Sequence, residues 1–511
     1  MKKSIALVLA LVFIMISMCG CNNESVSSLS SESTDGSEST VDYKVPESYE
    51  GPKLIATTVP TDAPNLSPDF AVKANGEEVG VYSDVNCWNG KVNFAYFDIA
   101  DDFQADVTVN VNFSFESVKI YPENLGIVPE RSNNELKFKV NEPNQKLTFV
   151  FDEDYKGTVL HLFVNRIDYD APKEGEAGVT YFGAGFHNLK DMYPNGIIPV
   201  GNGRTIYIAP GAVVLGGIQI TDVKNVSVKG SGVILMNYED NPQKCITVNQ
   251  SSNILIEGVI SSMQTSPAWV THIHYSTDVT IENYKVIAPH YASTDGIDIS
   301  NSSSVSVSNS FIRSCDDCIA IKGLGSDKAA PGDAVANDNI HISKCVLWND
   351  CNCSMVLGAE TRASKYSNIS FKDIDVIFSY DDKDHHERLS ERAVMNIICL
   401  WSTYFEDITW ENIRVNMGER LVGISFQPSF WFGTLKGDLS HPGHIKNVTY
   451  KNITSNNNSG SRISNEIMLY GWNKDLGISN ITFDNVVIEG KKIKNDNEFL
   501  MDTYVSELKF K

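Results

Sequence analysis

The sequence predicts an all-β fold, a parallel β-helix that follows a small N-terminal β-sandwich domain. The β-helix is predicted by a short motif, a polar residue followed by alternating apolar residues, which recurs at intervals of 25 to 40 residues. One such unit cannot bury its own apolar face, but stacked units share a continuous core. We expect the polar residue that opens each motif to hold a turn and to stack into a ladder between adjacent coils. The motif opens at Asn225, Asn253, Asp278, Ser304, Asn339, Asn368, Asp407, Asn447 and Asn480.

The first 50 residues are predicted to lie outside the folded part of the chain. Two lysines precede the apolar run Ile5–Ile16, which is typical of a secretory signal and too short for a membrane-spanning helix. We assign residues 1–21 to a signal peptide with a lipobox, in which Cys21 is the lipidated residue; cleavage without lipidation is the alternative. Residues 22–50 are read as a Ser/Thr-rich disordered linker. These features predict an extracellular, cell-surface lipoprotein of a bacterium, which contacts the membrane only through its N-terminal lipid anchor.

Residues 51–170 are predicted to form the β-sandwich domain. The run Phe70–Tyr82 contains Asn75-Gly76 between two extended stretches, which is a strong hairpin signal. Four further β-rich runs follow without any helical period, as expected for a sandwich of ordinary domain size. The Pro-, Gly- and charge-rich stretch Arg166–Gly178 marks the boundary, so residues 171–511 are assigned to the β-helix catalytic domain.

Net charge and cysteine spacing argue against nucleic acid and a metal ion as partners of this chain. The formal net charge of -22 would repel a polyphosphate, so nucleic acid is not expected as a partner. The eight cysteines beyond the signal region are scattered rather than spaced as a small disulfide scaffold. Cys315-x-x-Cys318 with Cys351-x-Cys353 is not a common zinc spacing, so no metal is expected; a disulfide within this group is favoured, with its pairing open. We expect a monomer without a cofactor.

Two copies of one short pattern lie 22 residues apart and carry the candidate chemistry. Asp295 opens D-G-I-D-I, and Asp317 opens D-C-I-A-I with Asp316 just before it. If the copies lie in register on adjacent coils, their isoleucines stack inside, and Asp298 and Lys322 point outward. The three opening carboxylates then crowd together on one outer surface. Asp316 and Asp317 are consecutive, so a bend or bulge is needed to bring both to the same face.

Three carboxylates within a few ångströms cannot all ionise easily. At least one pKa should be raised, which leaves a protonated acid beside ionised partners. That pairing is what cleavage of a glycosidic bond requires. A turn-capping or calcium-binding acid cluster is the alternative, and the stacking of Asp295 on the Asp pair favours catalysis.

The same residues carry a family resemblance. STDGID, SCDDCIAIKG and the preceding SPAWVTHIH (Ser266–His274) are similar to polygalacturonases and their relatives, glycoside hydrolase families 28 and 49. The resemblance covers roughly residues 180 to 490, and its two Asp motifs are specific. It implies a right-handed parallel β-helix that hydrolyses glycosidic bonds with inversion at the anomeric carbon.

The resemblance also implies a role for each aspartate. Asp316 matches the general acid, Asp295 and Asp317 match the pair that activates water, and Lys322 matches a polar cleft position. Coil spacing separates Asp295 from the pair by about 4.8 Å along the axis, and an opposite lean of Asp316 and Asp317 would add to that distance. Inverting enzymes need roughly 6.5–9.5 Å between acid and base to admit water. Stacking alone leaves the choice between inversion and retention open, and the resemblance favours inversion.

Departures from family 28 favour a neutral polysaccharide substrate, similar to that of the dextranases. The family's Gly-His-Gly segment is replaced by the stretch Cys351–Thr361, which lacks His, and no Arg-Ile-Lys motif follows Glu360 to bind a galacturonate carboxylate. Family 49 also has an N-terminal β-sandwich before its helix. Aromatic side chains are expected to stack on sugar rings. The residues predicted to bind substrate are Lys322, Asp298, Trp269, His272 and Trp431.

Three alternatives remain. A polygalacturonase-type pectin hydrolase is the first. A β-helix polysaccharide lyase is the second; it would need a basic proton abstractor and usually calcium, where this chain has acids. A non-catalytic glycan-binding surface protein is the third, although a binder gains nothing from three repelling carboxylates.

Overall fold

The computed structural model describes residues 45–64, 66–238, 243–265, 268–380, 392–430, 433–456, 461 and 463–511. Within these ranges nearly all regular structure is β-strand. The helical segments described are three single turns, η1 (Glu123–Leu125), η2 (Leu189–Asp191) and η3 (Pro331–Asp333), so none of them could span a lipid bilayer.

Two sheets form the N-terminal β-sandwich. Alternating residues of both sheets share one core, in which Phe70 and Val109 pack with Phe97, Phe149 and Leu162. The predicted hairpin is confirmed: β2 pairs with β3 around Asn75-Gly76, both of which have positive φ. The six-stranded sheet contains β1 (Leu54–Ala56), β4 (Val81–Val85), β5 (Lys91–Ile99), β7 (Val118–Tyr121), β10 (Gln145–Phe151) and β11 (Val159–Arg166). The five-stranded sheet contains β2 (Phe70–Ala74), β3 (Glu77–Val79), β6 (Ala105–Val111), β8 (Glu130–Ser132) and β9 (Glu135–Val140).

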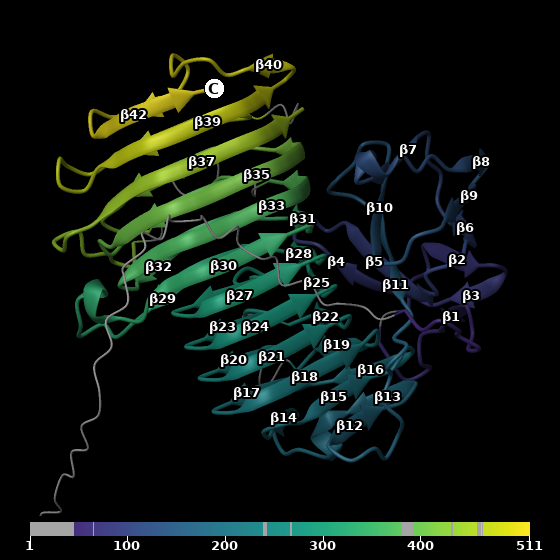
Figure 1. Ribbon diagram of the computed structural model, residues 1–511. Helices are drawn as coiled ribbons and strands as arrows, with labels where there is room; N and C mark the ends of the chain where they lie inside the picture. The colour runs from purple at the N-terminus through teal and green to yellow at the C-terminus, as the bar shows by residue number, and fades with distance from the viewer. Residues whose placement is uncertain are drawn as a thin grey trace, which may run out of the picture. The chain divides into compact units, whose positions relative to one another are not determined.

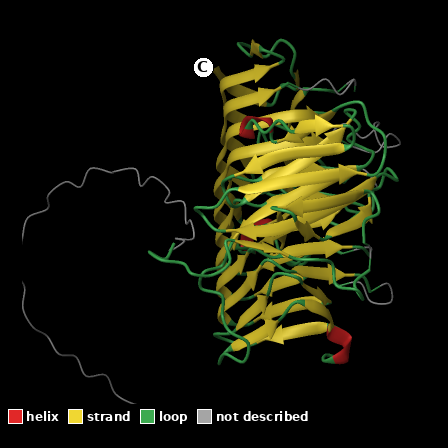
Figure 2. Ribbon diagram, turned by 90° about the vertical axis from the view of Figure 1, so that its right-hand side faces the viewer, coloured by secondary structure: helices red, strands yellow, loops and turns green. Residues whose placement is uncertain are grey.

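Beyond residue 178 the chain winds as a parallel β-helix, as predicted (Figures 1 and 2). In each regular coil the first strand joins an 11-stranded sheet, and the second and third strands join a 20-stranded sheet. The 11-stranded sheet contains β14 (Ile197–Val200), β17 (Gly217–Thr221), β20 (Ile246–Asn249), β23 (Thr271–His274), β26 (Ile297–Ser300), β29 (Ile319–Leu324), β32 (Met355–Arg362), β34 (Met395–Cys399), β36 (Val422–Phe426), β38 (Ile467–Tyr470) and β41 (Leu500–Met501).

The larger sheet holds the remaining strands. They are β12 (Val179–Phe182), β13 (Gly185–Asn188), β15 (Thr205–Ile208), β16 (Ala212–Leu215), β18 (Lys224–Gly230), β19 (Val233–Met236), β21 (Ser252–Glu257), β22 (Ile260–Met263), β24 (Thr277–Glu282), β25 (Lys285–Ala288), β27 (Ser303–Ser308), β28 (Phe311–Ser314), β30 (Asn337–Ser343), β31 (Val346–Asn349), β33 (Lys365–Ser379), β35 (Tyr404–Gly418), β37 (His444–Ser455), β39 (Ile478–Ile488), β40 (Lys491–Lys492) and β42 (Val505–Phe510).

The polar residue that opens each repeat motif is held in the left-handed region. All nine have φ between 52° and 60°, a conformation that Asn and Asp tolerate better than most residues. Their side chains bond between coils: the amide of Asn253 donates to Asn225, that of Asn368 to Asn339, and that of Asn480 to Asn447. The expected ladder therefore exists, and it uses the same residues that cap the turn.

Aliphatic side chains from successive coils stack inside the β-helix. Ile297 lies opposite Ile319, and Ile319 opposite Met355, in the register of the parallel strands. The stack of Ile299, Ile321 and Leu357 runs beside it, and all of these side chains are fully buried. Because every second residue of the strand points inward, the residues between them are placed on the outer face.

The six-stranded sheet of the sandwich packs its second face against the larger β-helix sheet. Aromatic residues such as Phe94 and Phe163 share a cluster with Phe311 and Trp348 of the β-helix. The buried guanidinium of Arg313 holds the junction together, because it donates to both carboxylate oxygens of Asp350 at 2.8 Å and contacts a ring nitrogen of His161 of the sandwich at 3.1 Å.

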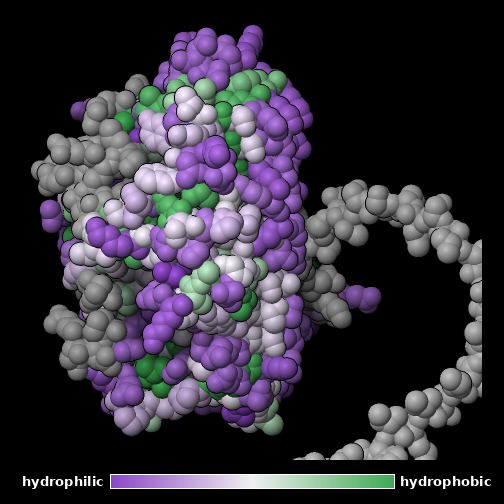
Figure 3. Space-filling model, turned by 90° about the vertical axis from the view of Figure 1, so that its left-hand side faces the viewer, coloured by the Kyte–Doolittle hydropathy of each residue, from purple (hydrophilic) through white to green (hydrophobic). Residues whose placement is uncertain are grey.

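The molecular face drawn in Figure 3 is mainly hydrophilic, with hydrophobic side chains in small patches.

Candidate active site

One column of side chains crosses the outer face at the N-terminal ends of successive strands of the 11-stranded sheet. The pairing of β20, β23, β26, β29 and β32 fixes its register. Counting back two residues from the first inward-facing residue of each strand gives Lys244, Trp269, Asp295, Asp317 and Cys353. Backbone hydrogen bonds continue through this segment, as from Gly296 N to the Asp317 carbonyl at 2.8 Å. The sequence period alone therefore aligns two of the three candidate carboxylates.

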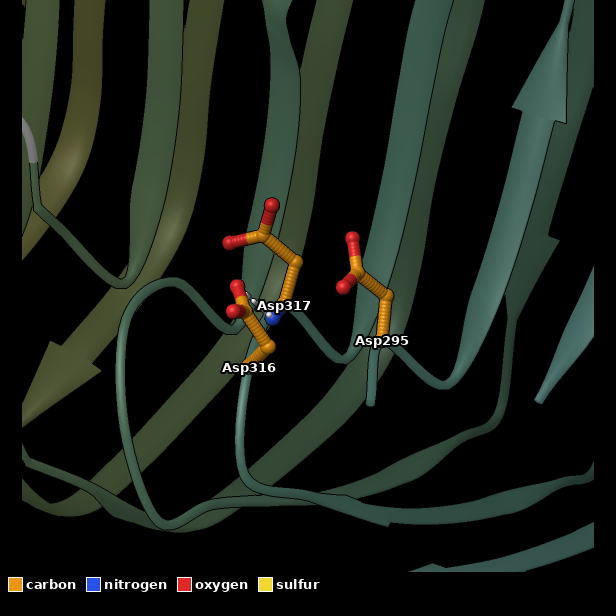
Figure 4. A group of neighbouring side chains, drawn as sticks. All are labelled: Asp295, Asp316 and Asp317. Carbon is orange, nitrogen blue, oxygen red and sulfur yellow. Dashed lines mark hydrogen bonds between the residues drawn. The ribbon is translucent and has the colours of Figure 1, made fainter. Parts of the chain in front are cut away.

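Asp316 joins this column because the chain bends before β29. Residues 315 and 316 form a bend between β28 and β29, as two consecutive carboxylates on one face require. One carboxylate oxygen each from Asp295, Asp316 and Asp317 lie within 4.8 Å of one another. Figure 4 shows the three side chains pointing to one shared space, Asp316 and Asp317 from one coil and Asp295 from the neighbouring coil.

The carboxylate of Asp316 is held by three N–H donors. The backbone N–H groups of Ser293 and Asp317 donate to it at 2.9 and 3.0 Å, and the side-chain amide of Asn352 donates at 2.7 Å. Asn352 has a positive φ of 83°, which aims the loop after β31 at the site. Asp316 is half-buried, whereas Asp295 and Asp317 are buried, so Asp316 is the most accessible of the three.

Burial raises the pKa of Asp295 and of Asp317 well above the usual range. For Asp295 the next cause is the neighbouring carboxylate of Asp298; for Asp317 it is that of Asp316. The backbone N–H of Cys353 donates to Asp317 at 3.1 Å and partly offsets this effect. The crowded trio therefore retains a proton at pH values where an exposed aspartate would be ionised.

Lys322 is the buried counter-ion of the site. Its ammonium nitrogen lies 2.6 Å from Asp295 Oδ2 and 2.9 Å from Asp298 Oδ1, and all three side chains are at most 6% exposed. Burial alone would lower the pKa of Lys322, but Asp295 and Asp298 outweigh it and hold that pKa well above its usual value. Burial raises the pKa of Asp298 to about 6, despite the nearby Lys322.

Trp269 lies between two lysines and a histidine on the same face. The ring is 4.2 Å from the Lys322 ammonium and 5.1 Å from that of Lys244, and it meets His272 edge-on at 4.9 Å. Burial lowers the pKa of His272 to about 2, so its ring is neutral, and its Nε2 lies 2.8 Å from the hydroxyl of Ser300. The structure thus brings four of the five residues predicted to bind substrate close to the trio.

Trp431 and Cys21 lie outside the described residues. The expected acid–base spacing of roughly 6.5–9.5 Å is not seen, because oxygens of all three carboxylates lie within 4.8 Å of one another. Three N–H donors hold the Asp316 carboxylate in this position.

Lys244 and Asn352 are the residues that sequence reasoning missed. Lys244 occupies the same register position as Trp269 and Asp295, so aligning every coil, and not only the two Asp motifs, would have found it. Nothing in the repeat identifies Asn352, because it lies in a loop of irregular length.

The outer face beyond the trio is apolar and partly enclosed. Outward side chains of β29, β32 and β34, namely Ala320, Val356 and Ile398, form a cluster with Trp401. Next to them lies a cavity of about 660 Å³. Its lining residues are Gly323, Leu324, Gly325, Ser326, Asp327, Glu360, Arg362, Trp401, Thr434, Leu435 and Lys436.

The Asp trio lies in a stretch that is similar to glycoside hydrolase family 28, and the fold is similar to that of the β-helix protein Dex49A. Residues 213–380 match the family model "Glycosyl hydrolases family 28", and this stretch contains all three aspartates. Among curated proteins, the probable endopolygalacturonase A of Aspergillus niger is 26% identical over 223 residues, 43% of this chain and 52% of the relative. The chain therefore spans about half the length of this relative.

One solved structure supports the fold. Dex49A from Penicillium minioluteum superposes with a TM-score of 0.65 at 15% identity, over 89% of this chain and 96% of that chain. A polygalacturonase from Erwinia carotovora has a TM-score of 0.45 at 14% identity, over 64% of this chain and 88% of that chain.

Proposed function

We propose that the chain is a glycoside hydrolase that cleaves α-glycosidic bonds in a polysaccharide through Asp295, Asp316 and Asp317. The observation that carries the proposal is the meeting of three carboxylates on adjacent coils, with one oxygen of each inside 4.8 Å, within the stretch that resembles family 28. A structural turn would not gather three repelling acids, two of them buried, beside a paired lysine.

In this proposal Asp316 protonates the glycosidic oxygen, because it is the carboxyl group of the trio that substrate reaches first. Asp295 and Asp317 bind the attacking water between neighbouring coils and take its proton. Lys322 favours the ionised form of Asp295, which a base must have.

The substrate proposed is a neutral, dextran-like polysaccharide. The described outward side chains of β34 are Asn396 and Ile398, so this strand presents no cation to a uronate carboxylate. Lys322 is already paired with two carboxylates, and Glu360 adds a further negative charge close enough to act on it. A polyanionic chain would therefore meet net negative charge at the point of cleavage.

A pectin hydrolase is the second candidate. It is supported by the 26% identity, over 223 residues, with a protein named as a probable endopolygalacturonase. Lys244 and Arg362 are the cations that could serve such a substrate, since the first lies beside Trp269 and the second lines the neighbouring cavity.

The test is a screen of the purified full-length chain against dextran, pullulan, polygalacturonate and rhamnogalacturonan. We expect reducing sugar from a neutral α-glucan at least about tenfold faster than from polygalacturonate, with no change when a chelator is added. Faster release from polygalacturonate would support the second candidate. An unsaturated, ultraviolet-absorbing product that forms only with calcium would show that the enzyme is a lyase and not a hydrolase.

Inversion of configuration is expected for the first product formed. The short spacing of the trio is nearer to the roughly 5–5.5 Å of retaining enzymes than to the spacing of inverting ones. The expectation of inversion therefore rests on the resemblance to the family and on two bases sharing one water. Proton NMR, recorded before the product equilibrates, measures it: an α-linked substrate should release the β-anomer. Early α-anomer would show that one of the carboxylates acts as a nucleophile.

The location proposed is the bacterial cell surface, with the chain held by a lipid on Cys21. This part of the proposal rests on the signal-like first 21 residues and the Ser/Thr-rich stretch that follows them.

A further inference from the structure

Three cysteines that are far apart in the sequence meet at the junction of the two domains. Cys87 lies in the turn between β4 and β5 of the sandwich, Cys315 follows β28, and Cys351 follows β31. β28 and β31 are neighbours in register, with Ser314 opposite Asn349. The residues that follow these two positions therefore leave the sheet side by side, which puts Cys315 and Cys351 on adjacent coils.

The sandwich supplies the third thiol through a turn that docks on the same coils. The backbone N–H of Cys87 donates to the carbonyl of Pro289 at 3.0 Å, and its thiol lies 3.9 Å from the carbonyl of Asp350. The side chains of Cys351 and Cys87 act on the Cys315 thiol and raise its pKa, with burial as a further cause, so both side chains lie near it. Cys315 is thus the central member of a three-thiol cluster.

The remaining cysteines have a different environment. The thiol of Cys318 lies 3.7 Å from the carbonyl of Ile312 and 3.4 Å from that of Trp348, and the thiol of Cys345 lies 3.2 Å from the carbonyl of Ser343. Both are fully buried. All eight described cysteines, Cys87 to Cys399, are in the thiol form, so the disulfide expected from sequence within the group 315, 318, 351 and 353 is not formed.

The three cysteines of the cluster differ in their exposure to solvent. Cys87 and Cys351 are half-buried, whereas Cys315 is 3% exposed. An oxidant from solvent therefore reaches Cys87 or Cys351 before it reaches Cys315, which is buried next to them.

We propose that Cys87, Cys315 and Cys351 form a thiol–disulfide exchange site. Cys315 forms a disulfide with one of the two outer cysteines, Cys87 or Cys351. The remaining outer thiol can then attack this disulfide and replace the first partner of Cys315. With glutathione disulfide as oxidant, the thiolate of Cys87 or Cys351 attacks one sulfur and releases one glutathione thiol. The Cys315 thiolate then attacks the protein sulfur of that mixed disulfide and releases the second. Two protein thiols thereby give up two protons and two electrons, which appear in the two molecules of reduced glutathione.

The thiol cluster lies next to the proposed catalytic residues in the sequence and in the fold. Cys315 directly precedes Asp316, and the hydroxyl of Ser314 donates to the Asp316 carbonyl at 2.8 Å. A bond from Cys315 to Cys87 would tie the sandwich to the bend that presents Asp316, whereas a bond to Cys351 would tie two coils of the β-helix. The two disulfides constrain different parts of the protein.

Peptide mapping of the full-length chain tests the proposal. The protein is equilibrated in glutathione buffers of increasing oxidised fraction, quenched in acid, alkylated and digested, and the linked peptides are identified by mass spectrometry. We expect the loss of two titratable thiols, with Cys315 linked to Cys87 or Cys351 and the third member alkylated. Cys87→Ser should leave only the Cys315–Cys351 link, Cys351→Ser only the Cys87–Cys315 link, and Cys315→Ser neither.

Cys345→Ser serves as the matched control, because it removes a buried thiol outside the cluster and should leave the mapping unchanged. The proposal is overturned if no linked peptide contains Cys315 at any glutathione ratio, or if the main disulfide joins cysteines outside the cluster. Wild-type mapping decides this without any variant, so a variant that fails to fold does not affect the result.

Discussion

Asp316→Asn is expected to lower kcat by about 10²- to 10⁴-fold, the usual contribution of a positioned general acid. An amide cannot give up the proton that the leaving oxygen needs. Its oxygen can still accept the hydrogen bonds from Asp317 N–H and the Asn352 amide, which share one carboxylate oxygen. Steady-state rates on the best substrate of the screen measure the effect.

Stability should change little in this variant. The bond from Ser293 N–H to the second oxygen is lost, at a cost of about 1 kcal/mol, and the removal of one repelling charge from beside Asp317 offsets it. The melting temperature should therefore stay close to that of the wild type. Asp278→Asn is the matched control, since it makes the same change at an exposed turn position of a nearby coil. Near-normal activity in Asp316→Asn would remove Asp316 from the mechanism.

Lys322→Met should lower the free energy of unfolding by about 3–5 kcal/mol at pH 7. Removing one partner of a buried ion pair leaves the other charge uncompensated, and that costs this much in other proteins. Here two buried carboxylates, Asp295 and Asp298, lose their shared cation. Methionine replaces most of the aliphatic part of the lysine side chain, so lost packing contributes little. Denaturant titration of the purified variant provides the measurement.

The loss of unfolding free energy in Lys322→Met should become larger as pH rises. A carboxyl group whose pKa is higher in the folded chain stabilises the fold below its unfolded value and loses this effect as pH rises through its folded value. Asp295, Asp298 and Asp317 have raised values, that of Asp298 being about 6. Without Lys322 these values rise further, so the variant should be closest to wild type near pH 4 and weakest near pH 8. Lys322 itself stays protonated throughout this window, because its own pKa is raised.

Lys244→Met is the control for this experiment. Lys244 is half-buried beside the same tryptophan, and none of its described contacts is an ion pair as short as those of Lys322. It should lose far less stability, with little dependence on pH. If Lys322→Met were no more destabilising than Lys244→Met at pH 7, the buried ion pair would not be a main support of the site.

Periodicity in the sequence determined the features that are set by backbone pairing. The spacing of the opening polar residues predicted the β-helix and the Asn ladder, since each turn needs a residue that tolerates positive φ and can bond to the next coil. The 22 residues between Asp295 and Asp317 are one coil, so their alignment follows from strand register. The bend at Asp316 follows from the need to place consecutive side chains on one face.

Tertiary structure decided the features that depend on loops and on burial. Asn352 reaches Asp316 from a loop whose length differs from coil to coil, and Cys87 arrives from another domain, so no repeat encodes either contact. The burial of Asp298 and Lys322 depends on side chains from neighbouring coils, such as Asp295 and Trp269. This burial sets the local dielectric environment, and with it which carboxyl groups keep a proton. Strand register is repeated along the chain by backbone hydrogen bonds, whereas side-chain burial is settled only when segments distant in sequence pack together.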